Sequence, residues 1–538
     1  MNRQMIRPAA ALVSIAGCMV GPDYQRPDVQ VPTEYHGTAP TTAPATQPVE
    51  RLTVVPGSAP VDRWWTALDD EVLDSLVDRA IQSNIDLELA EARVREARAQ
   101  RQVIAADLWP QFNLGGSHAY RGSSLNAQPK TNEPGLEAKA VGVATGALNS
   151  VAFAARSGTM GSGSVLTSVA VQQMSGRIQE KVNKVTVSRD MNLFQAGFDA
   201  SWELDIFGGT RRAMEAAEGQ FQAAQEDLHN LQTTLISEVA LNYVEARGYQ
   251  KRLAITRQNI ETMRESLELT RVRFQAGLTS ELDVAQAAAQ LATTESQVPV
   301  LEALWHQAVH RLGVLLGRPP GALLADMQAQ GPIPAAPPAV PVGLPSGLLR
   351  RRPDIRRSER QLAAATAQIG VAVADLYPRF SITGSFGTQT RDMQHFLDSN
   401  SLFWSIGPGV SWPIFEGGRI RANIKVQTER ERQAFALYHS TILTALEDVE
   451  NALVAYRQDQ QRWHHLGKAV DASHRALEVA TERYRKGLAD FLSVLESQRS
   501  LYLTQDQLAQ SEADVVANYI ALNKALGGGW QTIEEGND

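Results

Sequence analysis

The sequence predicts a membrane protein of mixed α+β class built from two tandem repeats. In this fold, strands from several identical copies close one barrel, which continues into a barrel of long α-helices. Three observations predict it. The same motifs recur in the same order in both halves of the chain. Two pairs of segments alternate apolar and polar residues, and very long helical patterns follow those segments.

The repeats are read from three ordered matches. Residues 106–112 match 374–380, residues 201–209 match 411–418, and residues 267–284 match 477–494. The predicted layout is a signal peptide at 1–17, a Pro-rich N-terminal segment at 18–61, repeat one at 62–317 with an insertion at 121–190, a Pro-rich linker at 318–343, repeat two at 344–530 and a tail at 531–538.

Each repeat is predicted to contain a helix, two strands, a long helix and a returning helix. The first helices span 71–107, with a break at Ser83-Asn84, and 353–375. The prolines Pro110 and Pro378 end these helices and start the first strand of each hairpin. The order is the same in both halves, so the two hairpins are expected to be equivalent.

The predicted strands have one apolar and one polar face. From Phe194 to Leu204, aromatic and aliphatic residues occupy every second position, and Asp199, Glu203 and Asp205 fall on the opposite face. This pattern fits either a half-buried soluble sheet or a barrel wall with lipid outside and water inside. On the second interpretation the three acids line the lumen and favour cations.

Four strands are too few to close a barrel, since about eight are the minimum. Three copies would bring twelve strands, and two copies would also reach the minimum. The helices that follow are long: 210–276 is roughly 100 Å if unbroken. Turns at Gly277 and Gly487 then reverse the chain, and Ser280 and Asp490 are placed to cap the returning helices, 281–316 and 491–526.

The first eighteen residues read as an export signal. Basic residues precede a short apolar run, and Cys18 follows the small residues Ala16-Gly17. This arrangement resembles a bacterial lipobox, in which the cysteine receives a lipid; an ordinary secretion signal is the alternative. Met19 follows the cysteine in place of the Asp of lipoproteins kept at the inner membrane, which indicates the outer membrane by resemblance.

Composition and motifs exclude several functions. The net charge of −8 argues against a nucleic-acid surface. Outside the predicted lipid site there is no cysteine, and no metal-binding or nucleophilic constellation stands out, so neither an enzyme such as a peptidoglycan hydrolase nor a cofactor other than the lipid on Cys18 is expected. A lipid-anchored coiled-coil scaffold without a pore stays possible, but it does not account for the alternating strands.

Several motifs together resemble the NodT-type efflux lipoproteins, which are TolC-like outer-membrane factors. The similar stretches are 18–27 (CMVGPDYQRP), 63–65 (RWW), 341–356 with RRRPDIR, and 526–530 (LGGGW). The resemblance covers nearly the whole chain except 121–190. It implies a homotrimer with a twelve-stranded barrel and a helical tunnel in the outer membrane of a Gram-negative bacterium. It also implies a periplasmic adaptor (membrane fusion) protein and an inner-membrane pump, usually of the resistance-nodulation-division (RND) class.

The resemblance further implies a periplasmic aperture at the helix turns, which opens when the adaptor engages. The matching residues are Tyr484, Leu492, Glu496 and Arg499, where family members often have Asp in place of the Glu. Spacing of four and three residues places the last three on one helix face. The repeat-one counterparts are Phe274, Leu282 and Gln286, which lack the acid, so repeat two is expected to dominate the aperture. The alternative interpretation is that these residues form an ordinary solvent-exposed helix surface without a role in an aperture.

Overall fold

The structure is a computed structural model that describes residues 19–36, 53–56, 62–122, 190–337 and 339–531. The chain divides into two compact units. The sheet unit comprises 1–24, 100–217 and 365–430, and the helical unit comprises 25–99, 218–364 and 431–538. Each unit is described by itself below.

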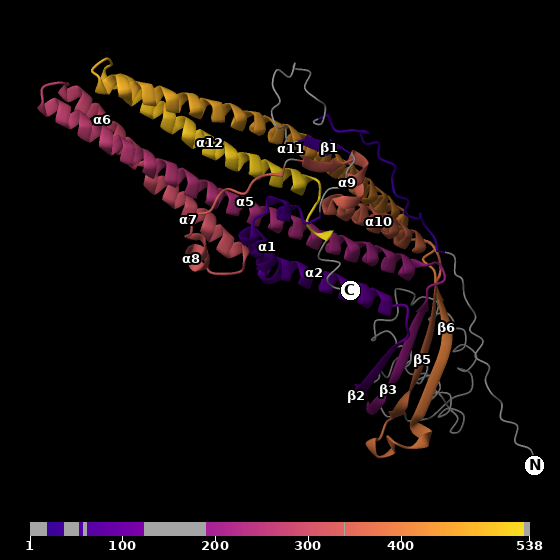
Figure 1. Ribbon diagram of the computed structural model, residues 1–538. Helices are drawn as coiled ribbons and strands as arrows, with labels where there is room; N and C mark the ends of the chain where they lie inside the picture. Colours follow the sequence, from indigo (N-terminus) through magenta and orange to yellow (C-terminus); the bar gives the residue numbers. More distant parts are fainter. Residues whose placement is uncertain (1–18, 37–52, 57–61, 123–189, 338, 532–538) are drawn as a thin grey trace, which may run out of the picture. The chain divides into compact units, whose positions relative to one another are not determined.

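The sheet unit contains one antiparallel sheet of four strands in the order β2-β3-β5-β6 (Figure 1). The strands are β2 (Gln111–Gly122), β3 (Asp190–Leu204), β5 (Arg379–Thr390) and β6 (Leu402–Ser411). Each repeat contributes one hairpin, and β3 pairs with β5 to join the two hairpins. Of the predicted insertion at 121–190, residues 121, 122 and 190 belong to β2 and β3, and residues 123–189 lie outside the described residues.

Rows of residues across the sheet confirm the predicted alternation. One row is apolar on all four strands: Leu114, Phe198, Phe386 and Trp404. The neighbouring row is polar on all four strands: Asn113, Asp199, Ser385 and Ser405. The apolar row is at least half exposed, from 54% to 75%. The sheet therefore has an apolar face, whose exposure to water is unfavourable, and a polar face on its other side.

The last predicted strand is shorter than expected. In the sequence, the alternation of apolar and polar residues runs from Trp404 to Ile414 and predicts a strand of that length, but β6 ends at Ser411. Pro413 lacks an amide hydrogen and cannot extend the pairing. Instead, the Trp412 Nε1–H donates to the Leu376 carbonyl at 3.0 Å. The equivalent tryptophan of repeat one, Trp202, donates to the Leu108 carbonyl at 2.9 Å, so both hairpins are fixed to the preceding segment in the same way.

The tip of the strand hairpin between β5 and β6 contains two 3-10 turns, η5 (Met393–His395) and η6 (Ser399–Ser401).

Two helices of 67 residues follow the strand hairpins, α5 (Gly209–Gln275) and α11 (Arg419–Arg485), and α5 confirms the predicted length. Among the described helices, none combines the length and the apolarity that a membrane-crossing helix requires.

The first helices of each repeat also agree with the predictions. They are α1 (Glu71–Ser83) and α2 (Ile85–Ala106) in repeat one, and α10 (Pro353–Ala374) in repeat two. The short helix α9 (Pro345–Arg351), which precedes α10, was not predicted. The predicted break falls at Asn84. Its side-chain Nδ2 donates to the Leu315 carbonyl at 2.8 Å, and its side-chain Oδ1 accepts from the Leu87 backbone amide at 3.0 Å. Asn84 therefore ends one helix and caps the next.

The returning helix of repeat one is interrupted, which corrects our prediction of one helix over 281–316. The structure has α6 (Glu281–Glu295) and α7 (Gln297–Leu315), separated at Ser296. Pro299 lies in the first turn of α7 and has no amide hydrogen to donate to Glu295. The returning helix of repeat two, α12 (Phe491–Ala525), is continuous.

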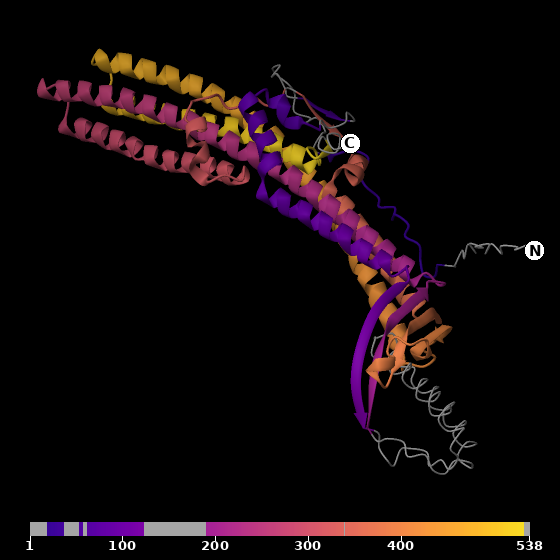
Figure 2. The same ribbon diagram turned by 90° about the horizontal axis from the view of Figure 1, so that it is seen from below.

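The helical unit is organised around a seam between α5 and α12, with α6 and α7 beside α5 and α11 beside α12 (Figures 1 and 2). The Arg252 guanidinium binds both Asp506 carboxylate oxygens at 2.7 and 3.0 Å. Further along, the Asn259 amide donates to Gln505 at 2.9 Å. Because α5 belongs to repeat one and α12 to repeat two, the seam holds the two repeats together within one chain.

The Pro-rich linker is more structured than we predicted. Between the repeats lie η4 (Pro320–Leu323), α8 (Leu324–Met327) and β4 (Ala339–Gly343). The strand β4 pairs in parallel with β1 (Thr53–Pro56) from the N-terminal segment. The short helix η2 (Trp64–Leu68) adds two fully buried tryptophans, Trp64 and Trp65, to this unit. The pairing of β4 with β1 could not be predicted from local sequence patterns, because the two strands are far apart along the chain.

Candidate functional site at the helix turns

Two similar turns end the long helices of the helical unit. Gly277 and Gly487 have φ angles of +71° and +69°, which favour glycine at the C-terminus of a helix. The predicted caps are confirmed: the Ser280 hydroxyl accepts from the Asp283 amide at 3.2 Å, and the Asp490 carboxylate accepts from the Ser493 amide at 3.0 Å. Both turns are therefore defined by local hydrogen bonds.

The carboxylates at these turns are held in their charged form. Hydrogen bonds from the Thr279 hydroxyl and from Ser280 lower the pKa of Asp283 below its ordinary value of 3.8. Hydrogen bonds from the hydroxyl and amide of Ser493 lower the pKa of Asp490 in the same direction. Both groups are ionised at neutral pH, as suits the N-terminus of a helix.

Three of the four predicted aperture residues lie on one exposed face of α12. Leu492 is 47% exposed, and Glu496 and Arg499 are exposed as well. They are free to face a neighbouring copy or a lumen. No ion pair within the described part of the chain involves Glu496 or Arg499.

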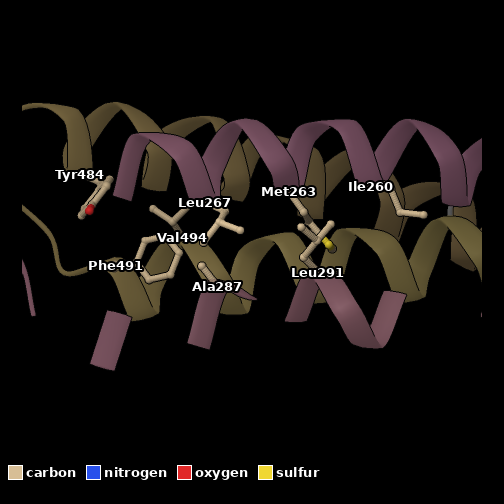
Figure 3. Close-up of a cluster of buried hydrophobic side chains, with 8 residues drawn as sticks. All are labelled: Ile260, Met263, Leu267, Ala287, Leu291, Tyr484, Phe491 and Val494. Carbon is tan, nitrogen blue, oxygen red and sulfur yellow. The ribbon is translucent and has the colours of Figure 1, made fainter. Parts of the chain in front are cut away.

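Tyr484 does not share this exposed face. It lies in a buried core that the helix pair α5 and α6 forms with the helix pair α11 and α12. It is 4% exposed and packs with Leu267, Phe491 and Val494 (Figure 3). Its ring centroid is 5.6 Å from that of Phe491. Tyr484 is therefore a core residue of the single chain, and the exposed trio is separate from it.

Arg273 is the functional candidate that sequence reasoning missed. Its guanidinium lies 4.5 Å from the centre of the Tyr484 ring, and its Nη1 donates to the Tyr484 carbonyl at 3.3 Å. This is a cation–π contact with an added hydrogen bond, and it links α5 to α11. The available signal was the repeat itself, because Arg273-Phe274 matches Arg483-Tyr484.

The repeat-one counterparts are more exposed than Tyr484. Phe274 is 43% exposed and Leu282 is 63% exposed, while Gln286 is half-buried. The two repeats therefore differ in their aromatic residue: the Phe of repeat one points to solvent and the Tyr of repeat two fills the core. The expectation that repeat two dominates the aperture stays a prediction.

The acids predicted to line the lumen lie in the sheet unit. Glu203 and Asp205 border a cleft of about 580 Å³ that also touches Asp107, Asp375 and Arg379. Asp205 has a structural task that we did not predict: its carboxylate accepts from the amides of Thr210 and Arg211 at 3.1 and 2.9 Å. It thereby caps α5, whereas Asp199 lies on the polar row of the sheet.

Within the described ranges, no group of three or more acidic, His or Cys side chains is placed to hold a metal ion. The predicted lipid site, Cys18, lies just outside those ranges.

The duplicated strand hairpins, each continuing into a 67-residue helix and a returning partner, define a TolC-like outer-membrane channel fold. The chain resembles the structure of the outer-membrane channel OprN with 34% identity and a TM-score of 0.78, over 96% of this chain and 100% of that chain. The Campylobacter jejuni CmeC outer membrane channel shares the fold with a TM-score of 0.75 at 22% identity, over 96% of this chain and 98% of that chain.

The chain belongs to the outer membrane efflux protein family, whose model matches residues 165–318 and 344–528. Among similar proteins, nodulation protein T of Rhizobium leguminosarum bv. trifolii is 30% identical, over 96% of both chains. The pyoverdine export outer membrane protein OpmQ of Pseudomonas aeruginosa is 31% identical, over 88% of this chain and 89% of that protein. The protein is therefore an outer-membrane efflux channel component and not an enzyme.

Proposed function

We propose that three copies of this chain form one exit duct, which receives pumped small molecules from a periplasmic adaptor and an inner-membrane pump of the RND class. The observation that carries the proposal is the sheet. Among the described residues, β2 and β6 each pair on one side only, so the sheet has two open edges. An even number of antiparallel strands lets β6 of one copy pair antiparallel with β2 of the next. Three copies then close twelve strands, and no backbone edge is left facing lipid.

The apolar rows of the sheet support this arrangement. Side chains such as Trp404, Ile406 and Val410 are 64% to 75% exposed in the single chain. Placed outward they meet lipid, and the polar row with Asp199 then lines a wet lumen. Together with Glu203, this row makes the lumen favour cations, whereas the predicted contribution of Asp205 is reduced because its carboxylate is paired with Arg211. We assign the two repeats to 62–317 and 344–530, with the linker at 318–343 between them.

We further propose that the mature chain begins at Cys18 and carries a lipid there. The basic start, the apolar run and the small residues before the cysteine support this assignment. The lipid anchors the chain in the outer membrane, and the helical unit extends into the periplasm. What the duct carries is set by the pump. The relatives named for pyoverdine export and the solvent efflux protein SrpC of Pseudomonas putida indicate small organic molecules.

The aperture is proposed to lie at the exposed face of α12. In three copies, Leu492 makes an apolar ring and Glu496 a ring of carboxylates, and Arg499 is free to pair with an acid of the neighbouring copy. Breaking these contacts opens the duct, and an adaptor that binds the open state better shifts the population toward it.

Single-channel conductance in planar bilayers tests the aperture. We expect Glu496→Ala and Arg499→Ala each to raise the resting conductance, because each removes a charge that ties neighbouring copies. Gln286→Ala is the matched control, since it changes the equivalent uncharged position of repeat one and should leave conductance as it is. Unchanged conductance in both charge variants would remove the aperture from α12.

A further inference from the structure

The segment that follows Cys18 is docked on the sheet unit. We define residues 19–23 as the N-terminal strap. The Val20 amide donates to the Phe207 carbonyl at 3.1 Å. Met19 packs on Gly208 so closely that a Cβ at position 208 would lie 2.7 Å from the Met19 Cγ. The strap is therefore attached at the turn that leads from β3 into α5.

Arg212, in the first turn of α5, holds the strap from the other side. Its Nε donates to the Val20 carbonyl at 3.1 Å, and its Nη2 donates to the Gly21 carbonyl at 3.4 Å and to the Asp23 carboxylate at 2.6 Å. The side chain is only 2% exposed. A buried guanidinium needs partners for its N–H groups, and the strap supplies three of them. Glu215 of the same helix supplies another at 2.7 Å.

The strap has little freedom to be seated in another way. Gly21 has a φ of +89°, and a Cβ there would lie 2.5 Å from the Gly370 Cα. A Cβ on Gly370 would in turn lie 2.8 Å from the Arg212 side chain. Two glycines are thus required for the strap, α10 and Arg212 to approach one another. A loose linker would need none of these features.

We propose that Arg212 is the positioning residue of the lipid anchor, so that the lipid is fixed to the helix end of the sheet and is not carried on a flexible tether. This inference rests on the proposed lipid at Cys18. Cys18 directly precedes Met19, so the Cα atom that carries the lipidated side chain is only about 4 Å from the first Cα atom of the docked strap. The exposed tryptophans Trp202 and Trp412 lie at the same end of the strands, where indole rings favour the membrane interface. The acyl chains therefore enter the bilayer next to the sheet.

Hydrogen–deuterium exchange of the full lipidated chain in detergent tests this. The N-terminal proteolytic fragment that contains Val20 is followed by mass spectrometry. In the native protein we expect one protected amide in this fragment, that of Val20, which exchanges at least about tenfold more slowly than in an unstructured peptide. A Val20 amide that exchanges at the unstructured rate in the native protein overturns the proposal without any variant.

Two variants sharpen the test. Gly21→Ala cannot be seated and should lose the protection completely. Asp23→Ala removes one contact to Arg212. Because the Asp23 carboxylate is 83% exposed, this contact is weak, and the protection of the Val20 amide should fall by no more than about fivefold. The control is Asp28→Ala, an exposed residue further along the chain, which should match the native protein. Full protection in Gly21→Ala would contradict the proposed seating.

The same samples separate this inference from the proposed function. The mass of the N-terminal fragment shows whether Cys18 carries a lipid, and conductance in planar bilayers shows whether the protein is a channel. A conducting, lipidated protein with an unprotected Val20 amide disproves the docked anchor alone. A protected Val20 amide on a chain without lipid disproves the lipid assignment and leaves the channel untouched.

Discussion

At the scale of single residues, the contact of Arg273 with Tyr484 links the long helices α5 and α11 close to the turns that follow them. It combines a cation over an aromatic ring with a hydrogen bond to the carbonyl of the same residue. The Tyr484 hydroxyl is buried and has no hydrogen-bond partner among the described residues. An unpaired buried hydroxyl costs free energy, which the packing of the ring and its contact with Arg273 must offset.

We expect Arg273→Met to loosen the turns. The variant keeps an apolar stem but loses the cation–π contact and the charged hydrogen bond, together about 2 kcal/mol. Local opening should therefore become about 30-fold more frequent. Hydrogen exchange of the amides around Tyr484 measures this. Arg483→Met alters the repeat-two equivalent, which is exposed, and should change exchange little. Equal effects in the two variants would contradict the special role of Arg273.

At the scale of elements, the two capped turns should respond to acid in a defined window. The pKa values of Asp283 and Asp490 are lowered by hydrogen bonds from Thr279 and from Ser493 respectively. A carboxylate whose pKa is lower in the folded state stabilises the fold fully above the ordinary value, and this stabilisation is lost as the pH falls through the folded value. The ordinary value is 3.8, so the loss occurs below it.

The turns should therefore stay intact between pH 7 and pH 5 and loosen only below about pH 3.8. Amide exchange at Ser493, corrected for the intrinsic effect of pH, is the measurement. Asp490→Ala should loosen the turn of repeat two already at pH 7, while the turn of repeat one behaves as in the native protein. Loosening of both native turns near pH 6 would show that other groups control them.

The elements also show what the sequence can predict. Strands and long helices were predicted well, because alternation and helical periodicity are local patterns that the fold uses directly. The interruption at Ser296 was missed because Pro299 in a first helical turn does not force a break. The contact of Arg273 with Tyr484 was missed for another reason. It joins helices from different repeats, and only the packed structure brings those residues together. Likewise, the alternation from Phe194 to Leu204 suggested a polar sheet face for Asp205, but this residue lies just beyond β3 and caps α5.

At the scale of the whole molecule, the open edges of β2 and β6 leave the four-stranded sheet of one copy unclosed among the described residues. The polar and apolar rows run across all four strands without a break, so the same two surfaces continue when a copy is added at either edge. The seam of α5 with α12 holds each chain together independently of its neighbours.

We expect the purified protein to be a trimer in detergent. Native mass spectrometry should give three times the mass of the lipidated chain, because an unclosed sheet leaves backbone groups unpaired in an apolar environment. Removing the lipid enzymatically should leave the trimer intact, since the strands and not the lipid close it. A monomer, or a dimer with a closed sheet, would contradict the proposed assembly.

The pairing of β1 with β4 has a consequence for the order of events during folding. Thr53 and Ala339 are neighbours in space, but all of repeat one lies between them in the chain. A strand near the start must therefore wait until the far end of the first repeat has been delivered across the inner membrane. During that delay its backbone groups have no strand partner, which exposes the nascent chain to aggregation and makes it a natural client for periplasmic chaperones.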